Sequence, residues 1–282
     1  MGIRIIADSA SDMSEKESKY LKILPLTVQF GDTEYQDGVT LSAEEFYKKL
    51  EESNELPKTS QVTPFAFEEA LREALDAGDT PIVITISSKL SGTYNSAVVA
   101  ASEFEEEINI IDSANVCAGE RILIEYALRL IEEGKTAEEI VKALENVKER
   151  ACLIAAFDTL EYLRRGGRIS NIEGVLGGML SIKPVLGVKD GALESLGKAR
   201  GSKNAANLLL KQIEEAGGID HTMPFVLVYS GLDDTRVRKF AKDNEAIFKR
   251  NAEDIKICIV GSTVGTHAGP GALGAIFFKA EK

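Results

Sequence analysis

Two hydroxyl-rich segments of the chain could bind an anion: KTSQVTP at residues 58–64 and SSKLSGTYNSA at residues 87–97. The second segment follows the apolar run IVITI, predicted to be a buried strand, and leads into a predicted helix. A strand, a Ser/Gly loop and a helix N-terminus together offer free backbone N–H groups, a favourable helix dipole and hydroxyl donors. The alternative is that Ser91 only caps the helix that follows it.

A third segment, GSTVGTHAGPGALG at residues 261–274, surrounds His267 with glycines, and His267 is one of two histidines in the chain. The part GPGALG matches the pattern G-x-G-x-x-G of dinucleotide-binding loops. That loop must open a helix, whereas the residues that follow, IFFKA, predict a strand, so we do not expect a nucleotide site here. The glycines could form tight turns, or they could expose backbone N–H groups to a bound anion.

Three carboxylates, Asp8, Asp12 and Asp112, follow the ends of predicted strands, where α/β proteins place their sites. A hydrolase with paired carboxylates is therefore one possible function. The alternative is that Asp8 and Asp112 cap nearby helices or turns. The two histidines and three cysteines have no metal-ligand spacing, so no metal and no cofactor is expected. The sequence also lacks the G-x-S-x-G pattern of many serine hydrolases.

Composition narrows the class of protein. The 282 residues carry a formal net charge of −12, which argues against a nucleic-acid binder and against an anionic membrane surface. An odd number of scattered cysteines indicates a reducing compartment, and the first apolar run is short for a signal peptide. No stretch approaches the roughly 18 apolar residues of a membrane span. We expect a cytoplasmic protein without an integral membrane segment.

Strands that alternate with helices along the chain predict an α/β architecture. The length suggests two domains, since a domain takes about 150 residues, and we place them at residues 1–150 and 151–282. Within the second, Asp190-Gly191 lies between two predicted strands and is a strong hairpin signal.

Taken together, these segments resemble the DegV family of fatty-acid-binding proteins. The resemblance extends over nearly the whole chain, in order and in spacing. Its segments are IRIIADSASD, LPLTVQFGDTEYQDG, KTSQVTP, ISSKLSGTYNSA, YLRRGGRIS, SIKPVLGVKDG and GTHAGPGALG. It implies a two-domain α/β fold, which we expect to contain a mostly parallel sheet flanked by helices in each domain. A lipid pocket is expected near the domain interface.

The resemblance also implies a function and its residues. The hydroxyls of Thr59 and Ser91 would hold the carboxylate of one long-chain fatty acid, with His267 at the same end of the pocket. The protein would not be an enzyme itself. It would present the carboxylate to a separate ATP-dependent kinase subunit, similar to dihydroxyacetone kinases, which forms an acyl phosphate for phospholipid synthesis. Arg168 and Arg200 would engage that subunit, and we expect neither to contact the lipid.

Two other functions stay open at this point. One is a stand-alone enzyme of small-molecule or lipid metabolism, such as a hydrolase that uses Ser91 with His267. The other is a signalling module that senses a lipid without any kinase. The hydrolase would turn over acyl esters without a partner, which separates it from a carrier.

Overall fold

The computed structural model describes residues 2–53, 55–169 and 181–281. Its first half is built on a four-stranded sheet, in which all three strand pairs are parallel. The order β2-β1-β6-β7 comprises β2 (Leu21–Leu24), β1 (Gly2–Asp8), β6 (Asp79–Thr85) and β7 (Asn109–Asp112). Along β1, Ile5 and Ala7 pack into one apolar cluster and Ile6 into another, since successive side chains point to opposite faces. Both faces are therefore buried, as the run IRIIA predicts for a parallel sheet.

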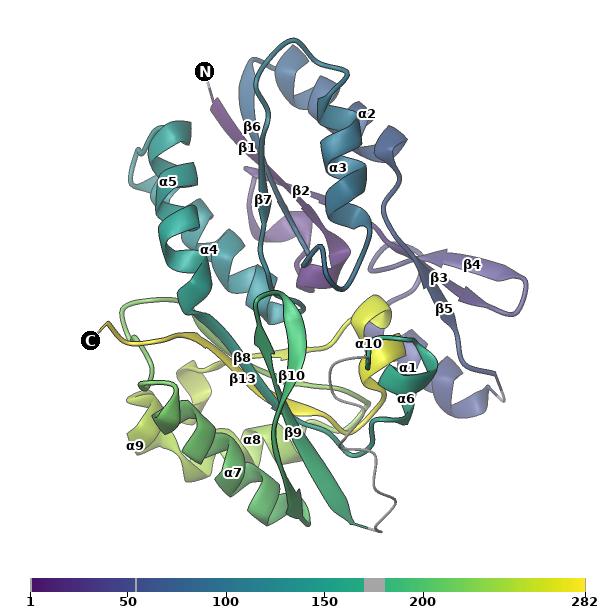
Figure 1. The fold of residues 1–282 in the computed structure, drawn as a ribbon, viewed down its shortest axis with the longest axis vertical. Coiled ribbons are helices and arrows are strands. Elements are labelled where there is room, and N and C mark those ends of the chain that lie inside the picture. The colour runs from purple at the N-terminus through teal and green to yellow at the C-terminus, as the bar shows by residue number, and fades with distance from the viewer. Residues whose placement is uncertain (1, 54, 170–180, 282) are drawn as a thin grey trace.

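Helices cover both faces of this sheet (Figure 1). They are α2 (Pro64–Asp76), α3 (Thr93–Ala101), α4 (Ala118–Glu132) and α5 (Ala137–Val147). α1 (Ala43–Glu52) does not cover this sheet, since its Phe46, Tyr47 and Leu50 belong to a separate apolar cluster. α2 and α3 pack together on one face, while α4 and α5 pack on the other. α1 and α5 begin with capping boxes at Ser42 and Thr136, and each box closes through a glutamate three residues on.

A small antiparallel sheet projects from this half at the right of Figure 1. It has the order β4-β3-β5 and comprises β4 (Thr33–Gln36), β3 (Thr27–Phe30) and β5 (Lys58–Ser60). The segment over residues 24–30 does not form one continuous strand: the chain leaves β2 at Leu24 and starts β3 at Thr27, because Pro25 cannot donate to a ladder. The pairing places Thr59 opposite Val28 and so fixes the first hydroxyl-rich segment in space.

The second half contains a six-stranded sheet of order β10-β9-β8-β13-β11-β12. Its strands are β8 (Ala151–Ala156), β9 (Ile182–Lys189), β10 (Ala192–Arg200), β11 (Phe225–Tyr229), β12 (Lys256–Ile259) and β13 (Leu273–Phe278). Of its strand pairs among the described residues, β11–β12 alone is parallel. The expectation of a mostly parallel sheet is therefore wrong for this half. Parallel neighbours need a crossover, whereas the Asp190-Gly191 hairpin joins β9 to β10 directly and β13 runs back between β8 and β11.

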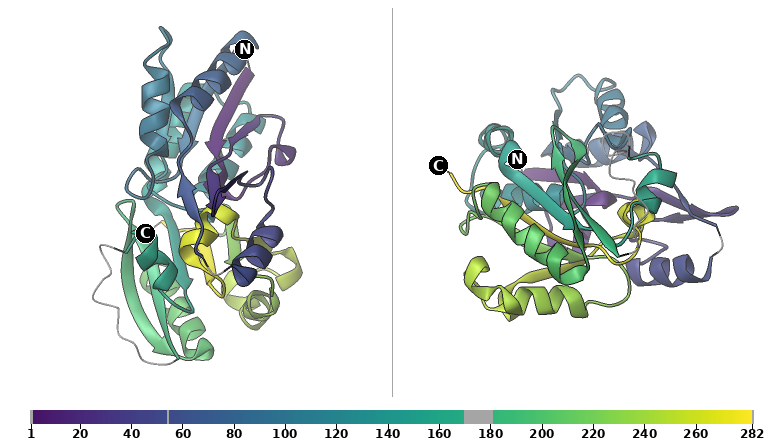
Figure 2. Two further views of the ribbon diagram at one scale, coloured as in Figure 1. Left: turned by 90° about the vertical axis from the view of Figure 1, so that its right-hand side faces the viewer. Right: turned by 60° about the horizontal axis from the view of Figure 1, so that its bottom comes forward.

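The structure describes five helices in the second half. They are α6 (Glu161–Arg165), α7 (Ser202–Glu215), α8 (Thr235–Asp243), α9 (Glu245–Phe248) and α10 (Ser262–Ala268). Four 3₁₀ turns complete the described elements: η1 (Ser9–Ser11), η2 (Glu15–Glu17), η3 (Lys148–Arg150) and η5 (Ala252–Asp254). α10 lies within the glycine-rich segment, where only a loop was expected. Figure 2 shows it at the junction of the two halves.

One apolar cluster is shared by the two large sheets. It contains Ile5 and Ile82 of the first sheet together with Leu153, Val226 and Ile276 of the second. The two halves therefore bury a common core, and the boundary near residue 150 stays a prediction. No helix among the described residues is long and apolar enough to cross a membrane.

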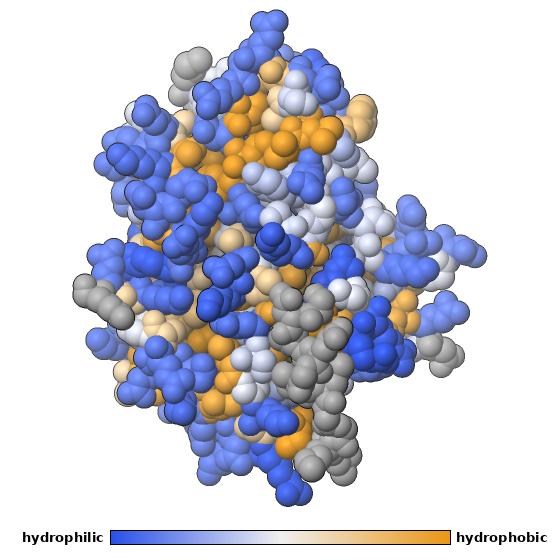
Figure 3. Space-filling model, in the orientation of Figure 1, coloured by the Kyte–Doolittle hydropathy of each residue, from blue (hydrophilic) through white to orange (hydrophobic). Residues whose placement is uncertain are grey.

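The surface in Figure 3 is mainly hydrophilic, with apolar atoms gathered in the upper part of that face near α3. α3 carries two exposed valines, Val98 and Val99. Its buried side chains pack on α2 and the first sheet. The face with Val98 and Val99 is separate from the cavity described next, since neither valine lines it.

Candidate functional site

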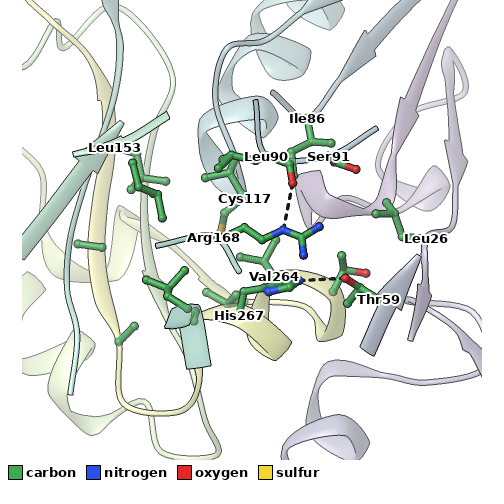
Figure 4. A pocket seen from close by; sticks show the side chains of 18 of the residues that line it. Leu26, Thr59, Ile86, Leu90, Ser91, Cys117, Leu153, Arg168, Val264 and His267 are labelled. Carbon is green, nitrogen blue, oxygen red and sulfur yellow. Dashed lines mark hydrogen bonds between the residues drawn. The ribbon is translucent and has the colours of Figure 1, made fainter. Parts of the chain in front are cut away.

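A cavity of about 460 Å³ lies where the two halves meet. Side chains of the first sheet's loops, of β8 and β11, and of α10 line it. The lining residues are Leu26, Thr59, Ser60, Gln61, Ile86, Leu90, Ser91, Gly92, Val116, Cys117, Leu153, Ala155, Phe157, Leu163, Arg168, Leu193, Val228, Val260, Thr263, Val264, His267, Ala268 and Ala272. Figure 4 shows the polar groups of Thr59, Ser91, Arg168 and His267 at one end, while Leu153 lies at the other. The cavity is thus an apolar chamber with one polar end.

Thr59 and His267 meet at that polar end, although they lie 208 residues apart in the chain. β5 carries Thr59, and α10 carries His267, which is the second residue from the end of that helix. The Thr59 hydroxyl oxygen lies 2.9 Å from His267 Nε2, within hydrogen-bonding distance (Figure 4). The structure therefore brings two of the three residues expected at the head group into direct contact.

Ser91 lines the same cavity and also serves the start of α3. Its hydroxyl oxygen accepts the backbone N–H of Thr93 at 3.3 Å and lies 2.9 Å from the Thr93 hydroxyl. The N-cap of α3 is Gly92, without a side-chain capping bond, so Ser91 is not the N-cap that the alternative proposed, although its hydroxyl contacts the first residue of the helix. A hydroxyl that accepts from the helix keeps its own hydrogen, which it can donate to a ligand.

A side-chain hydrogen bond joins the two hydroxyl-rich segments close to Ser91. The Gln61 side-chain amide donates to the Ser96 hydroxyl at 2.7 Å. At Gly92, a Cβ atom would lie 2.0 Å from Gln61 Oε1, so that position has room for glycine alone unless Gln61 moves. This close approach fixes the distance between the Thr59 and Ser91 segments.

His267 is held as a neutral imidazole. Burial, and to a lesser extent the charge of nearby Arg168, lower its pKa to about 4. Its Nδ1 atom is buried and has no hydrogen-bond partner among the residues that the structure describes. α6 packs tightly on this ring, because a Cβ atom at Gly166 would lie 2.2 Å from Nδ1. A neutral imidazole can donate from one nitrogen or accept at the other, without adding charge to the site.

Arg168 reaches the polar end of the cavity, which corrects the expectation that it lies apart from the ligand site. Its Nε–H donates to the Leu90 carbonyl at 3.3 Å and its Nη1–H to the Gly166 carbonyl at 2.6 Å. Figure 4 shows the guanidinium between Ser91 and the Thr59–His267 pair. The residue is exposed overall, so it lies at the mouth. The direction of a side chain in a turn depends on its tertiary contacts, so the position of the Arg168 guanidinium could not be predicted from local propensities.

Arg200 lies elsewhere. It is the last residue of β10, is exposed and does not line the cavity. The hairpin turn at the other end of β10 contacts the first half, where the Ser87 hydroxyl donates to the Gly191 carbonyl at 2.6 Å. Arg200 is nine residues from Gly191, roughly 30 Å along an extended strand. Ser170, the last residue of the YLRRGGRIS segment, lies outside the described residues.

The carboxylates considered from the sequence have structural partners. Asp8 accepts the backbone N–H groups of Ala10 and Ile86, and Asp112 accepts those of Ser88 and Ala114. Burial raises the pKa of Asp8 to about 7. No Asp or Glu lines the cavity among the described residues, which leaves the paired-carboxylate hydrolase without support.

Asp12 has a different partner set. It accepts the Gly261 N–H at 2.8 Å and the Cys117 thiol at 3.0 Å, and burial raises its pKa to about 7. Within the described ranges, no group of three His, Cys, Asp or Glu side chains is arranged to hold a metal ion.

The DegV family model, whose description is "Uncharacterised protein, DegV family", matches residues 2–280 of this chain. A DegV domain-containing protein of Caldanaerobacter subterraneus is 36% identical over 280 residues, which covers 98% of both chains. Two solved structures are similar over nearly the whole chain.

The first is a DegV family protein from Thermus thermophilus, described for its fatty acid binding. It has a TM-score of 0.89 and 30% identity, with 99% of this chain and 100% of that chain covered. The second is the fatty acid kinase (Fak) B3 protein of Streptococcus pneumoniae, solved with linoleic acid. It has a TM-score of 0.85 and 25% identity, with the same coverage.

Proposed function

The chain belongs to the DegV family, and from that premise we propose that it binds one long-chain fatty acid in the cavity between its two halves. The observation that carries this proposal is the shape and chemistry of that cavity. Its lining is mainly apolar, and hydroxyls, an imidazole and a guanidinium lie together on one side of it. The descriptions of the Thermus thermophilus and Streptococcus pneumoniae structures, which name fatty acids, support it.

The tail and the carboxylate place different demands on the cavity. Each CH₂ group removed from water contributes about 0.8 kcal/mol, and the costs of association and ordering offset much of the total. A carboxylate that leaves water must be hydrogen-bonded, because an unpaired buried charge costs several kcal/mol. The hydroxyls of Thr59 and Ser91 donate to it in our proposal. Neutral His267 donates its Nε2–H to the Thr59 hydroxyl oxygen, which leaves the hydroxyl hydrogen of Thr59 for the carboxylate.

We extend this proposal to a presenting role. The chain lacks a nucleotide-binding loop in its sequence, so acyl phosphate formation requires a separate ATP-dependent kinase subunit. The likeness to the Fak B3 protein supports this role. Arg168 lies at the mouth, beside the head group, where a docked partner meets it. Arg200 is retained as a second docking residue in this proposal, away from the cavity.

The stand-alone hydrolase with Ser91 and His267 has less support from the geometry. A nucleophile and its base must be in hydrogen-bonding reach, and a further group must orient the base. The described polar contact of the Ser91 hydroxyl is with Thr93, whereas the His267 Nε2 contact is with Thr59. Within the described part of the chain, no group bonds His267 Nδ1 and could orient the ring. A lipid-sensing module would use the same cavity and differs only in its partner.

The proposal predicts that the delipidated protein binds palmitate with one site per chain and binds hexadecanol at least roughly tenfold more weakly. The tails are the same, but the alcohol lacks the charge that the donors are arranged to receive, and hydrogen bonds to charged groups are the stronger ones. Isothermal titration calorimetry measures both affinities. Absence of palmitate binding contradicts the proposal, and turnover of an acyl ester by the protein alone supports the hydrolase instead.

A further inference from the structure

Asp37 is a buried carboxylate outside the cavity, and it lies directly after β4. It is 4% exposed, and no ion pair of the described residues includes it. A charge removed from water in this way is retained only if several donors satisfy it. Its contacts therefore indicate what it stabilises.

The two oxygens of Asp37 receive four donors. One oxygen accepts the backbone N–H of Ser262 at 3.1 Å together with the Ser262 hydroxyl. The other accepts the Ser9 hydroxyl at 3.0 Å and the backbone N–H of Thr263 at 3.3 Å. Three of these four donors belong to the first two residues of α10. A carboxylate at this end of a helix also faces the positive end of the helix dipole.

α10 depends on such external contacts for its position. It has seven residues, fewer than a helix needs to be stable alone, and Gly261 before it has no side chain to cap it. Asp37 and Asp12, both from the first half of the chain, supply the acceptors instead. At Gly265, a Cβ atom would lie 2.8 Å from the Phe46 ring, so α10 is also pressed closely onto α1.

The far end of this helix carries His267, five residues after Ser262. His267 contacts Thr59 in the cavity, and Thr263 and Val264 line the same cavity from the intervening turn. A small rotation or shift of α10 would therefore move the imidazole relative to Thr59. Contacts in a binding site depend steeply on such displacements.

We propose that Asp37 is a positioning residue of the head-group site, which acts through α10 to hold His267 against Thr59. This role rests on the proposed function, because it assumes that a fatty acid carboxylate binds at this end of the cavity. It assigns Asp37 no contact with the ligand. This role predicts that a substitution at Asp37 weakens binding of the carboxylate and leaves binding of the tail unchanged.

The test uses Asp37→Asn, which keeps the shape of the side chain but offers one oxygen where four donors converge. Serine hydroxyls can turn to other acceptors, whereas the N–H groups of Ser262 and Thr263 cannot, so the start of α10 loses an acceptor. Palmitate affinity is expected to fall roughly tenfold, and hexadecanol affinity to change by less than about threefold. Ser262→Ala, which retains both backbone bonds, is expected to show the same pattern with a smaller loss.

A spectroscopic measurement on the ligand-free protein reports the position of His267 directly. The chain has two histidines, so the imidazole nitrogen spectrum contains two sets of signals, and His221 provides an internal reference. In Asp37→Asn the His267 signals should shift at constant pH, because the contact with Thr59 changes, while the His221 signals stay in place. The matched control is Asp233→Asn, which removes the charge of the carboxylate that accepts the Thr235 N–H at the start of α8 and should leave both sets unchanged.

Wild-type His267 signals and palmitate affinity in a folded Asp37→Asn protein overturn the proposal. Equal losses of palmitate and hexadecanol affinity without a His267 shift also overturn it, because Asp37 then supports the cavity as a whole. If Asp37→Asn does not fold, Ser262→Ala decides by the same two measurements. If the wild-type protein itself does not bind palmitate, the proposed function fails, and the His267 shift still decides whether Asp37 positions α10.

Discussion

Replacing Thr59 and Ser91 together by alanine is expected to weaken fatty acid binding by roughly 10²–10⁴-fold. Each hydrogen bond to a charged group contributes about 1.5–3 kcal/mol, and each 1.4 kcal/mol is a factor of ten. Loss of Thr59 also removes the group that lies 2.9 Å from His267 Nε2. Each single substitution should produce part of this loss. Calorimetric titration with palmitate measures the affinities.

The matched control for this double variant removes two hydroxyls from the same region that do not line the cavity. Thr63 caps α2, where it accepts the Ala66 N–H, and the Ser102 hydroxyl at the end of α3 donates to the Val99 carbonyl. Thr63→Ala with Ser102→Ala should therefore cost some stability and leave palmitate affinity as it is. Unchanged affinity in the Thr59 and Ser91 double variant would contradict the head-group assignment.

Reversing the charge of Arg168 is the second large effect that we expect. Arg168→Glu should weaken palmitate binding roughly tenfold to a hundredfold, because a repulsive charge replaces an attractive one beside the carboxylate. Two unit charges about 4 Å apart near a protein surface interact by about 1–4 kcal/mol, less where water screens them. The guanidinium is exposed, so the effect should decrease as the salt concentration rises.

Arg200→Glu is the comparison for that prediction, since Arg200 is exposed and does not line the cavity. It should leave palmitate affinity unchanged while it slows acyl phosphate formation with a kinase subunit, because charges at the rim of an interface mainly set association rates. An Arg168→Glu protein with wild-type palmitate affinity contradicts the position assigned to its guanidinium. Loss of lipid binding in Arg200→Glu contradicts its assignment to docking.

The strands and most helices could be predicted from local patterns in the sequence. The burial of Ile5 and Ile6 on opposite faces of the first sheet, the capping boxes and the Asp190-Gly191 hairpin all follow from neighbours within a few residues. The partner of each strand does not follow from such local patterns, because strand pairing joins segments far apart in the chain. The position of β13 between β8 and β11, which makes the second sheet mostly antiparallel, has no local signal.

The site was predictable to a different degree at each residue. The loop before α3 offered the features of an anion site from the residues alone, but the joint role of Thr59, Ser91 and His267 came from the family resemblance. α10 escaped prediction because it is short and contains Gly265, which lowers helix propensity. That glycine is required by packing, since α10 lies against the rings of Phe46 and Tyr47. Without α10, the contact between Asp37 and Ser262 could not be foreseen.

The most direct test of fatty acid binding is native mass spectrometry of the protein purified from bacterial cells without delipidation. A ligand that fills the apolar chamber and reaches its polar end should survive purification, because its tail is removed from water. We expect one added mass of roughly 250–285 Da per chain, that of a fatty acid of about 16 to 18 carbons. The same mass should be absent from the Thr59→Ala, Ser91→Ala double variant. A wild-type protein that carries no such mass, and gains none when palmitate is added, would contradict the account.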